Sequence, residues 1–408
     1  MKSLLNPYKG LPKEIYILFV GKIVNSIGAF VHPLMSLILT QRIGMSAFEA
    51  GQFITMLAVF QCPCMILGGK LVDSIGRRKV IIGFQTLGAL MFIVCGLIPI
   101  STLTAKMMIL SACFYSVSSP AYDALNADLT DESNRKEAYS LLYMGTNIGF
   151  AIGPILGGFL YKNYLPLIFI GDAITTLVAL FLFIKYVKET KHKTCENEVE
   201  EIEFENSKVS TVKVFLKRPI LILFPLMMIL FQFVYSGWGF SLPLQMGELF
   251  GNEGAKLYGF LGAFNAIIVI TCTPLLTSKT RKYNPLNIMS LGGLCYGLCF
   301  LIFGYSKIMT LFFIGTLSLT IGEILIAINS STFIANNTPS SHRGRISSII
   351  PILMGSGYAS GPMIMGKIID ISGMYMACMI VTIIAVIGSV GMFSLNKVNN
   401  INNSYERK

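Results

Sequence analysis

Three carboxylic acids lie inside long apolar stretches of the sequence, away from the ends of those stretches: Asp123, Asp172 and Glu323. An ionised acid at the middle of a membrane costs about 2.5 to 3.5 kcal/mol on insertion scales, so such a residue is expected to have a function. A carboxyl group at that depth can exchange a proton near neutral pH. We predict proton coupling at Glu323, halfway along its stretch, and at Asp123, which shares a helix face with Ser119 and Asn126. For Asp172 we predict a structural hydrogen bond. Glu323 has two alternative roles, as the binding site of a cationic substrate or as a permanent hydrogen-bond partner of a neighbouring helix.

The stretches that carry these acids are predicted to be membrane-spanning helices. Hydrophobic residues make up 53% of the 408 residues and charged residues only 13%, against roughly 25% charged in soluble domains. Twelve stretches are long enough to cross about 30 Å of hydrocarbon as helices. They cover residues 14–39, 46–68, 79–100, 102–127, 138–161, 164–187, 218–244, 254–276, 285–305, 308–334, 345–368 and 373–396. The composition predicts an all-α, multi-pass membrane protein.

The positions of Lys and Arg predict the orientation of the chain. Most of the 32 Lys and Arg residues fall on one side of the bilayer if both termini are placed there, and positively charged loops face the cytoplasm. This topology also explains the net charge of +11 without a nucleic-acid partner. No cleavable signal segment is expected before the first stretch.

The longest polar segment, residues 188–217, divides the stretches six and six. We predict an N-terminal bundle (1–187), a cytoplasmic linker (188–217), a C-terminal bundle (218–396) and a cytoplasmic tail (397–408). The linker and the tail are expected to be solvated and partly flexible.

An internal repeat supports this division. Shifting the sequence by 208 residues aligns identical residues in, and just before, the fifth and eleventh stretches. The pairs are Arg135 and Arg343, Gly149 and Gly357, Gly153 and Gly361, Pro154 and Pro362, and Gly158 and Gly366. Two parallel six-helix halves, related by an axis along the membrane normal, would produce this pattern.

The loop between the second and third stretches is unusually polar: it has the sequence Gly-Lys-Leu-Val-Asp-Ser-Ile-Gly-Arg-Arg-Lys and runs from Gly69 to Lys79. Gly69 is expected to admit a neighbouring backbone, and Gly76 to permit a tight reversal. Asp73 can face the positive N-terminus of a helix. The pattern G-x-L-x-D-x-x-G-R-R-K resembles the signature loop of the major facilitator superfamily, a large class of secondary transporters. The equivalent segment of the second half, residues 277–287, keeps the positive charge but not the Asp and Gly.

The resemblance implies a gate at this loop. Asp73 would meet the N-terminus of the eleventh helix near residues 343–347, and Arg77, next to Arg78, would pair with Asp128 at the end of the fourth helix. Such contacts would hold the two halves together in the outward-facing state and break when the inner side opens. The alternative is that these residues only cap helices and set the topology.

The fifth stretch contains small residues at helical spacing: Gly149, Gly153, Pro154, Gly157 and Gly158. Such residues let membrane helices pack closely, which is one interpretation. The other is a resemblance to the antiporter motif of the drug:proton antiporter branch of the superfamily. The sequence departs from that motif at Ser140, nine residues before Gly149, where the motif has a glycine.

The superfamily lines its central cavity with the first, fourth, seventh and tenth helices. By resemblance, the candidate cavity residues here are Asn25, His32, Tyr115, Tyr122, Gln232, Tyr235 and Trp238. Lys22 lies on the same helix face as Asn25 and His32. It is also near enough to the inner surface for its ammonium group to reach the water there. Lys22 therefore either only reaches the surface or takes part in transport. His32 either titrates or is a fixed hydrogen-bond partner.

The resemblance implies a monomeric secondary transporter of the cell membrane, with a small-molecule substrate, the proton as coupling ion and no cofactor. We expect proton-coupled efflux of small amphipathic compounds or drugs by alternating access. One alternative is proton-coupled uptake or facilitated diffusion of a polar nutrient such as a sugar or organic acid. A Lys or Arg at the centre of the cavity would favour uptake of anions. Another is a transporter-like sensor without flux. The sequence contains no Walker loop, no clustered Ser, His and Asp and no metal-ligand cluster, so no ATPase, other enzyme or metal site is expected.

Overall fold

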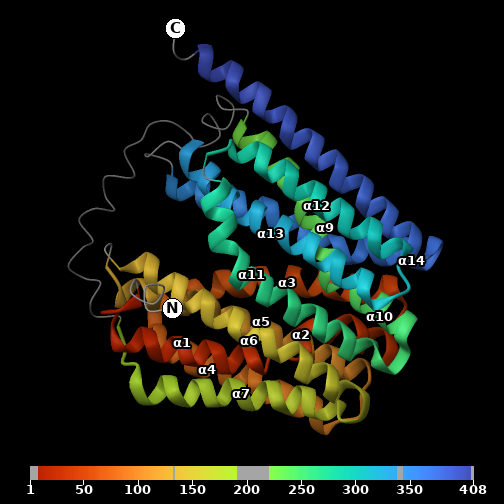
Figure 1. The fold of residues 1–408 in the computed structure, drawn as a ribbon. Coiled ribbons are helices and arrows are strands. Elements are labelled where there is room, and N and C mark those ends of the chain that lie inside the picture. The colour runs from red at the N-terminus through yellow and green to blue at the C-terminus, as the bar shows by residue number, and fades with distance from the viewer. Residues whose placement is uncertain (1–7, 132–133, 191–219, 281, 338–342, 406–408) are drawn as a thin grey trace. The chain divides into compact units, whose positions relative to one another are not determined.

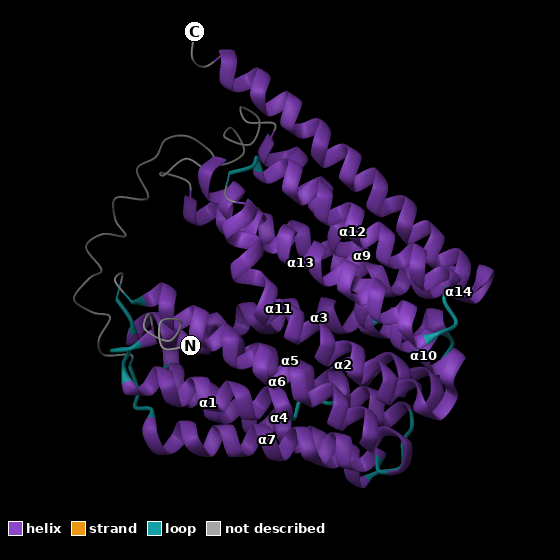
Figure 2. Ribbon diagram, in the orientation of Figure 1, coloured by secondary structure: helices purple, strands orange, loops and turns teal. Residues whose placement is uncertain are grey.

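The computed structural model describes residues 8–131, 134–190, 220–280, 282–337 and 343–405. These residues form helices joined by short loops, and no strand occurs among them (Figures 1 and 2). The predicted all-α class is confirmed.

The first half of the chain begins with a broken helix, made of α1 (Lys13–Ile27), α2 (Val31–Leu37) and a π-helical turn (Ile38–Arg42). The helices that follow are α3 (Ala47–Ile75), α4 (Arg77–Leu97), α5 (Thr102–Leu129), α6 (Arg135–Asn163) and α7 (Leu165–Tyr186). The second half contains α9 (Ile220–Gly239), α10 (Ser241–Phe250), a 3-10 turn (Gly251–Glu253), α11 (Gly254–Thr280), α12 (Pro285–Tyr305), α13 (Met309–Asn337) and α14 (Arg343–Tyr405).

Glycines with positive φ separate several helices. Gly76 has φ 97° and joins α3 to α4, so the reversal predicted there is confirmed. Gly373, with φ 80°, interrupts α14 at the first residue of the stretch predicted as the twelfth span. Beyond that point the helix continues to Tyr405. The helix thus extends over residues 397–405 of the predicted tail, because no Gly or Pro ends it earlier; that the tail is solvated and partly flexible stays a prediction.

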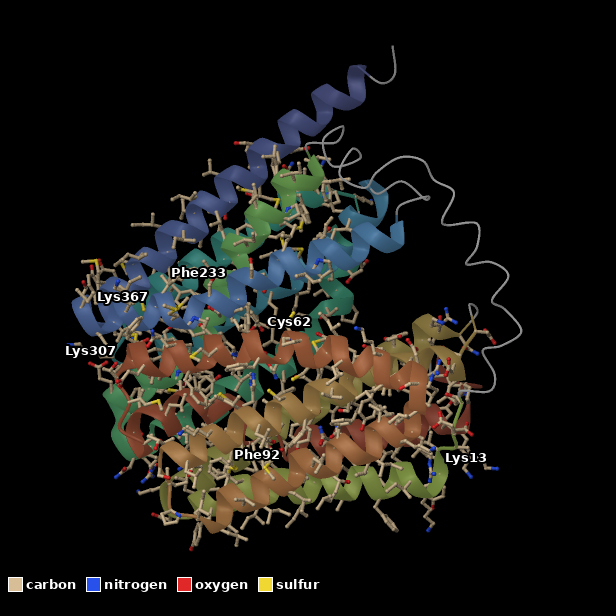
Figure 3. All side chains as sticks on the ribbon, turned by 180° about the vertical axis from the view of Figure 1, so that it is seen from behind. Lys13, Cys62, Phe92, Phe233, Lys307 and Lys367 are labelled. Atoms are coloured by element: carbon tan, nitrogen blue, oxygen red, sulfur yellow. The ribbon has the colours of Figure 1, made fainter. Side chains whose placement is uncertain are left out.

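Nine stretches of the described residues are long and apolar enough to cross a membrane. Two of them, Ile220–Thr280 with 61 residues and Ile350–Asn396 with 47, each exceed twice the ~20 residues that one crossing needs. Many large apolar side chains are exposed, among them Leu97 at 73%, as expected for a surface that lipid covers. In Figure 3, Lys13 lies at the end of the first-half helices and Phe92 lies along their middle. The chain is a multi-pass membrane protein, and the number twelve stays a prediction.

The residues divide into two compact units. The first unit comprises residues 1–45, 56–199 and 246–266, and the second comprises residues 46–55, 200–245 and 267–408. The first unit therefore includes the beginning of α11, from the second half of the chain. The second unit includes the beginning of α3, from the first half. These two segments correspond to each other in the internal repeat, because residues 46–55 shifted by 208 become residues 254–263.

Glycine contacts within each unit repeat with the same shift. In the first unit, Gly158 of α6 lies against the backbone of Ala255 and Lys256 at the start of α11. In the second unit, Gly366 of α14 lies against the backbone of Ala47 and Phe48 at the start of α3. Gly259 and Gly51 meet the residues Pro154 and Pro362 in the same way. The aligned glycines and prolines are therefore places where two helix backbones meet, for which only a missing side chain leaves room.

Candidate functional site

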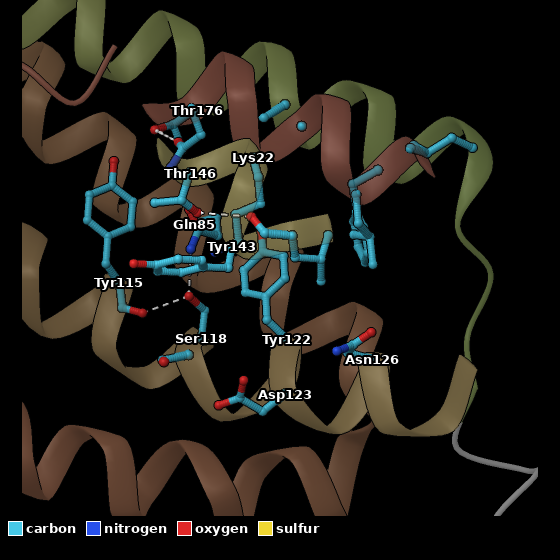
Figure 4. Close-up of a pocket in the computed structure, with 18 of the residues that line it drawn as sticks. Lys22, Gln85, Tyr115, Ser118, Tyr122, Asp123, Asn126, Tyr143, Thr146 and Thr176 are labelled. Atoms are coloured by element: carbon cyan, nitrogen blue, oxygen red, sulfur yellow. Dashed lines mark hydrogen bonds between the residues drawn. The ribbon is translucent and has the colours of Figure 1, made fainter. Parts of the chain in front are cut away.

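The first unit contains a cavity of about 420 Å³ between α1, α4, α5, α6 and α7 (Figure 4), a size within the usual range for small-molecule sites. Its polar and aromatic lining consists of Lys22, Asn25, Gln85, Tyr115, Ser118, Ser119, Tyr122, Asp123, Asn126, Tyr139, Tyr143, Thr146, Thr176 and Phe183. The structure thus brings together Asn25, Tyr115, Tyr122 and Asp123, which were predicted from the sequence.

Helix α5 supplies the largest share of the polar lining. Its residues Tyr115, Ser118, Tyr122 and Asn126 recur every three or four positions and so share one helix face. Alone among the long helices of the first half, α5 is not one of the nine apolar stretches. Its low hydropathy follows from this polar face, which turns toward a cavity rather than toward lipid.

Hydrogen bonds hold the walls of the cavity in place. The Gln85 amide donates to the Ser118 hydroxyl at 2.7 Å, and Ser118 donates to the carbonyl of Tyr115 at 2.7 Å. On the other side, the Thr176 hydroxyl donates to Oδ1 of Asn25 at 2.9 Å. These contacts tie α4 to α5 and α7 to α1, so the cavity is a preformed space.

Two opposite charges line this cavity, Lys22 on α1 and Asp123 on α5. The Lys22 ammonium lies 5.4 Å from the ring centroid of Tyr122, within the range of a cation–π contact. Lys22 and Asp123 attract each other electrostatically, but they are not among the described ion pairs closer than 4 Å. Lys22 was only a candidate from the sequence, and the helix face that it shares with Asn25 was the signal that places it at the cavity.

Asn126 lies at the edge of the cavity with its polar atoms buried. The residue is 1% exposed, and neither its amide nitrogen nor its amide oxygen has a hydrogen-bond partner in the described part of the chain. Such groups are nearly always paired, since leaving one unpaired costs about 1 to 3 kcal/mol. Asn126 therefore offers both a donor and an acceptor to a bound molecule.

A second cavity of about 320 Å³ lies where the first helix is broken. It shares Asn25, Gln85, Tyr115 and Thr176 with the first cavity, and His32 also lines it. Asp172 of α7, which is 8% exposed, accepts a hydrogen bond from the backbone N–H of Val31 at the start of α2. The structural hydrogen bond predicted for Asp172 is confirmed.

The glycines of α6 make room for this break. Gly149 and Gly153 lie against the backbone of Ser26 and Ile27, and Gly157 lies against Phe30. Their predicted role in close helix packing is confirmed by these contacts. The antiporter role of the same residues stays a prediction.

Glu323 has different surroundings, in the second unit. On α13 it faces Tyr235 of α9 and Tyr296 of α12. The ring of Tyr235 stacks on Tyr296 with centroids 5.8 Å apart and lies 6.4 Å from Tyr358. The predicted candidates Glu323 and Tyr235 are therefore together. Gln232 and Trp238 lie on the same helix, α9, but line neither of the two cavities described above.

The polar loop between α3 and α4 is fastened to the first unit. Arg77 Nε lies 2.9 Å from Asp128 Oδ2, so the predicted pair is present. The carboxylate of Glu189 accepts hydrogen bonds from the backbone N–H groups of Arg77 and Arg78 at 3.0 and 3.1 Å, and Thr190 donates to Asp128 at 2.6 Å. Glu189 thereby caps α4. Glu189 and Thr190, at the start of the predicted linker, are therefore fixed to the first unit, and the flexibility of the linker stays a prediction.

Two other expectations for this loop have different outcomes. Among the described residues nothing approaches a Cβ placed on Gly69, whereas one on Gly68 would meet the backbone of Val117. The predicted close approach at Gly69 is therefore wrong by one position, which on a helix is a turn of 100°. Asp73 is exposed within the first unit. Its predicted partner, the N-terminus of α14 near residues 343–347, belongs to the second unit, and this contact stays a prediction.

Long apolar helices around a charged cavity are the architecture of a membrane transporter. The chain matches the family model "Major Facilitator Superfamily" over residues 18–362 and belongs to this family. A Na(+), Li(+), K(+)/H(+) antiporter of Planococcus maritimus is 22% identical over 358 residues, which are 82% of this chain and 84% of that protein. Multidrug resistance protein MdtH of Proteus mirabilis is 29% identical over 168 residues, 41% of this chain and 42% of that protein.

A solved structure of a POT family transporter in complex with 5-aminolevulinic acid has the same fold, with a TM-score of 0.73 at 15% identity. The alignment covers 95% of this chain and 96% of that one. These proteins are transporters, and this chain is a transporter rather than an enzyme.

Proposed function

We propose that the chain exports small amphipathic compounds in exchange for protons, by alternating access. The observation that carries the proposal is Glu323, a half-buried acid within a membrane helix that lies beside two tyrosines, Tyr235 and Tyr296. An acid in such a setting is suited to taking up and releasing one proton in each transport cycle. The relatives named as a cation/proton antiporter and as a multidrug resistance protein support antiport and efflux.

In this proposal the cavity of the first unit binds the substrate. Its aromatic side chains, Tyr115, Tyr122 and Tyr143 among them, suit an apolar body, while Lys22 and Asp123 supply charge. The loop from Gly69 to Lys79 acts as the gate, with Arg77 and Asp128 as the pair that holds it. The protein works as a monomer in the cell membrane with both termini in the cytoplasm.

Susceptibility of cells that express the chain tests export. We expect expression to raise the inhibitory concentration of at least one compound in a panel of amphipathic cations, anions and zwitterions. Glu323→Gln should remove this resistance at equal expression. Full resistance with Glu323→Gln would contradict the proposed role of Glu323.

Proton-coupled uptake of a polar nutrient is the second candidate. It is favoured by one observation, the position of Lys22 at the cavity, because a cation there attracts anionic nutrients. Uptake predicts the opposite outcome in the same cells: expression would lower the inhibitory concentration of a toxic anionic compound.

A further inference from the structure

The two charged residues that line the first cavity indicate which charges its ligand should carry. Lys22 and Asp123 line the same space, yet no ion pair closer than 4 Å joins them among the described contacts. Asp123 is exposed and Lys22 is partly exposed, so both charges are accessible to a ligand in this space. A ligand that brings a countercharge to each residue would compensate both.

The sign of each charge limits what the cavity accepts. A molecule with a single positive charge is attracted by Asp123 and repelled by Lys22, and a molecule with a single negative charge experiences the reverse. The two effects largely cancel for either kind of ion. A molecule with both charges can place its anionic group at Lys22 and its cationic group at Asp123.

The remaining lining fits the neutral part of such a ligand. Tyr122 lies under the Lys22 ammonium, and its ring packs against Phe183 with centroids 6.3 Å apart. These rings form an apolar wall beside the charges. Asn126, which is buried and has no described hydrogen-bond partner, adds a donor and an acceptor one helix turn from Asp123.

We propose that this cavity selects zwitterions: small molecules that carry a carboxylate and a protonated amine on an apolar or aromatic body. The carboxylate binds at Lys22, the ammonium binds at Asp123, and the body lies against the tyrosines. This inference deepens the proposed function, since it names the substrate class of the proposed site. It concerns binding alone and requires no proton gradient.

Three probes with the same aromatic ring test the proposal. Phenylalanine carries both charges, phenethylamine only the amine, and 3-phenylpropionate only the carboxylate. Their dissociation constants can be measured on the full-length protein in nanodiscs by calorimetry. We expect phenylalanine to bind about tenfold or more tighter than either single-charge probe, since a hydrogen bond to a charged group contributes this much. Equal affinities, or no binding of phenylalanine, would overturn the proposal.

Two variants assign the charges. Lys22→Gln should weaken phenylalanine binding about tenfold and leave phenethylamine unchanged or tighter. Asp123→Asn should weaken phenylalanine binding to a similar extent and leave 3-phenylpropionate unchanged or tighter. Lys185→Gln is the matched control, because Lys185 is an exposed lysine of the same unit that does not line the cavity. Parallel loss of all three probes in Lys22→Gln would assign Lys22 a structural role and contradict the proposal.

Folding and transport are separated from binding by two further measurements. Lys22→Arg keeps the positive charge and should keep the preference for phenylalanine. Loss of this preference together with a lowered melting temperature would indicate that Lys22 has a packing role. That result would count against the proposal. Glu323→Gln should keep the full preference, because Glu323 lies in the other unit. The preference for phenylalanine can therefore be absent while proton coupling by Glu323 is present. Proton coupling can likewise be absent while the preference for phenylalanine is present, so the two proposals are tested separately.

Discussion

Asp123 and Glu323 are both acids within the helices of this transporter, but their surroundings differ. Asp123 is exposed to a cavity that Lys22 also lines. Glu323 faces Tyr235 and Tyr296 in the other unit. A carboxylate that shares an open cavity with a cation is suited to holding a charged ligand. A half-buried carboxyl group beside tyrosine side chains, outside both described cavities, is better suited to proton exchange.

The internal repeat shows at which equivalent positions the charged residues of the two halves differ. A shift of 208 residues places Leu230 at the position of Lys22, Ser331 at that of Asp123, and Glu323 at that of Tyr115. The second half therefore lacks the pair of opposite charges and has an acid where the first half has a tyrosine. The helix contacts of the two halves are alike, while their charged residues are not.

The largest expected effect concerns the loop between α3 and α4. Arg77 and Asp128 are both about nine-tenths buried as side chains, at 10% exposure each. Asp128→Asn leaves the Arg77 charge uncompensated and should lower the free energy of unfolding by about 3 kcal/mol. The measurement is thermal unfolding of the purified variant in detergent.

The corresponding region of the second half is held by neutral groups and supplies the comparison. The side chain of Asn284 accepts from the backbone N–H of Leu286 at 2.9 Å and donates to Asn396 at 2.8 Å. Asn284→Ala removes a helix cap and should cost only about 1 kcal/mol. An equal loss of stability in Asp128→Asn and Asn284→Ala would show that the charges at the first loop contribute nothing special.

Substitutions at the glycine contacts test the similarity of the two halves. Gly158→Ala and Gly366→Ala each place a methyl group against the backbone of another helix and should destabilise the protein by about 1 to 3 kcal/mol. Both should have a similar effect, because the contacts are equivalent in the repeat. Their melting temperatures in detergent provide the comparison.

Each half offers a matched control for this test. Gly83 of α4 and Gly355 of α14 lie in helices, and nothing described lies within 4 Å of a Cβ placed there. Gly83→Ala and Gly355→Ala should therefore raise stability by about 0.5 to 1 kcal/mol through helix propensity alone. Destabilisation by these controls, or tolerance of Gly158→Ala, would contradict the packing described here.

The smallest effect is expected at Tyr235. Tyr235→Phe keeps the ring stack with Tyr296 but removes the hydroxyl that faces Glu323. Proton-driven transport should fall about 3- to 10-fold, the contribution of one hydrogen bond, while binding in the first cavity stays the same. The control is Tyr305→Phe, which removes an exposed hydroxyl bonded to Tyr375. Weaker ligand binding in Tyr235→Phe would link the two sites and contradict their separate roles.

The sequence predicted the features that depend on residue type and period. Apolar length predicted the helices, the small residues of the fifth stretch predicted close helix packing, and Gly76 predicted the turn before α4. Arg77 and Asp128 were paired through the family resemblance. Each of these follows from local chemistry or from a pattern that the chain repeats.

Features that depend on which way a side chain points were harder to predict. Gly68 rather than Gly69 meets a backbone, since one residue turns the helix by 100°. The cap that Glu189 places on α4 was missed because a polar segment after the last helix is normally solvated. Lys22 was left open because a lysine near a helix end can extend to the surface as easily as into a cavity.

The most direct test of the account compares Glu323→Gln with Asp123→Asn in proteoliposomes, using the compound to which expression confers the largest resistance. Two rates are measured, accumulation driven by a pH gradient and exchange of labelled for unlabelled compound without a gradient. We expect Glu323→Gln to lose accumulation but keep exchange, and Asp123→Asn to lose both. Gradient-driven accumulation by Glu323→Gln at the rate of the unaltered protein would contradict this expectation.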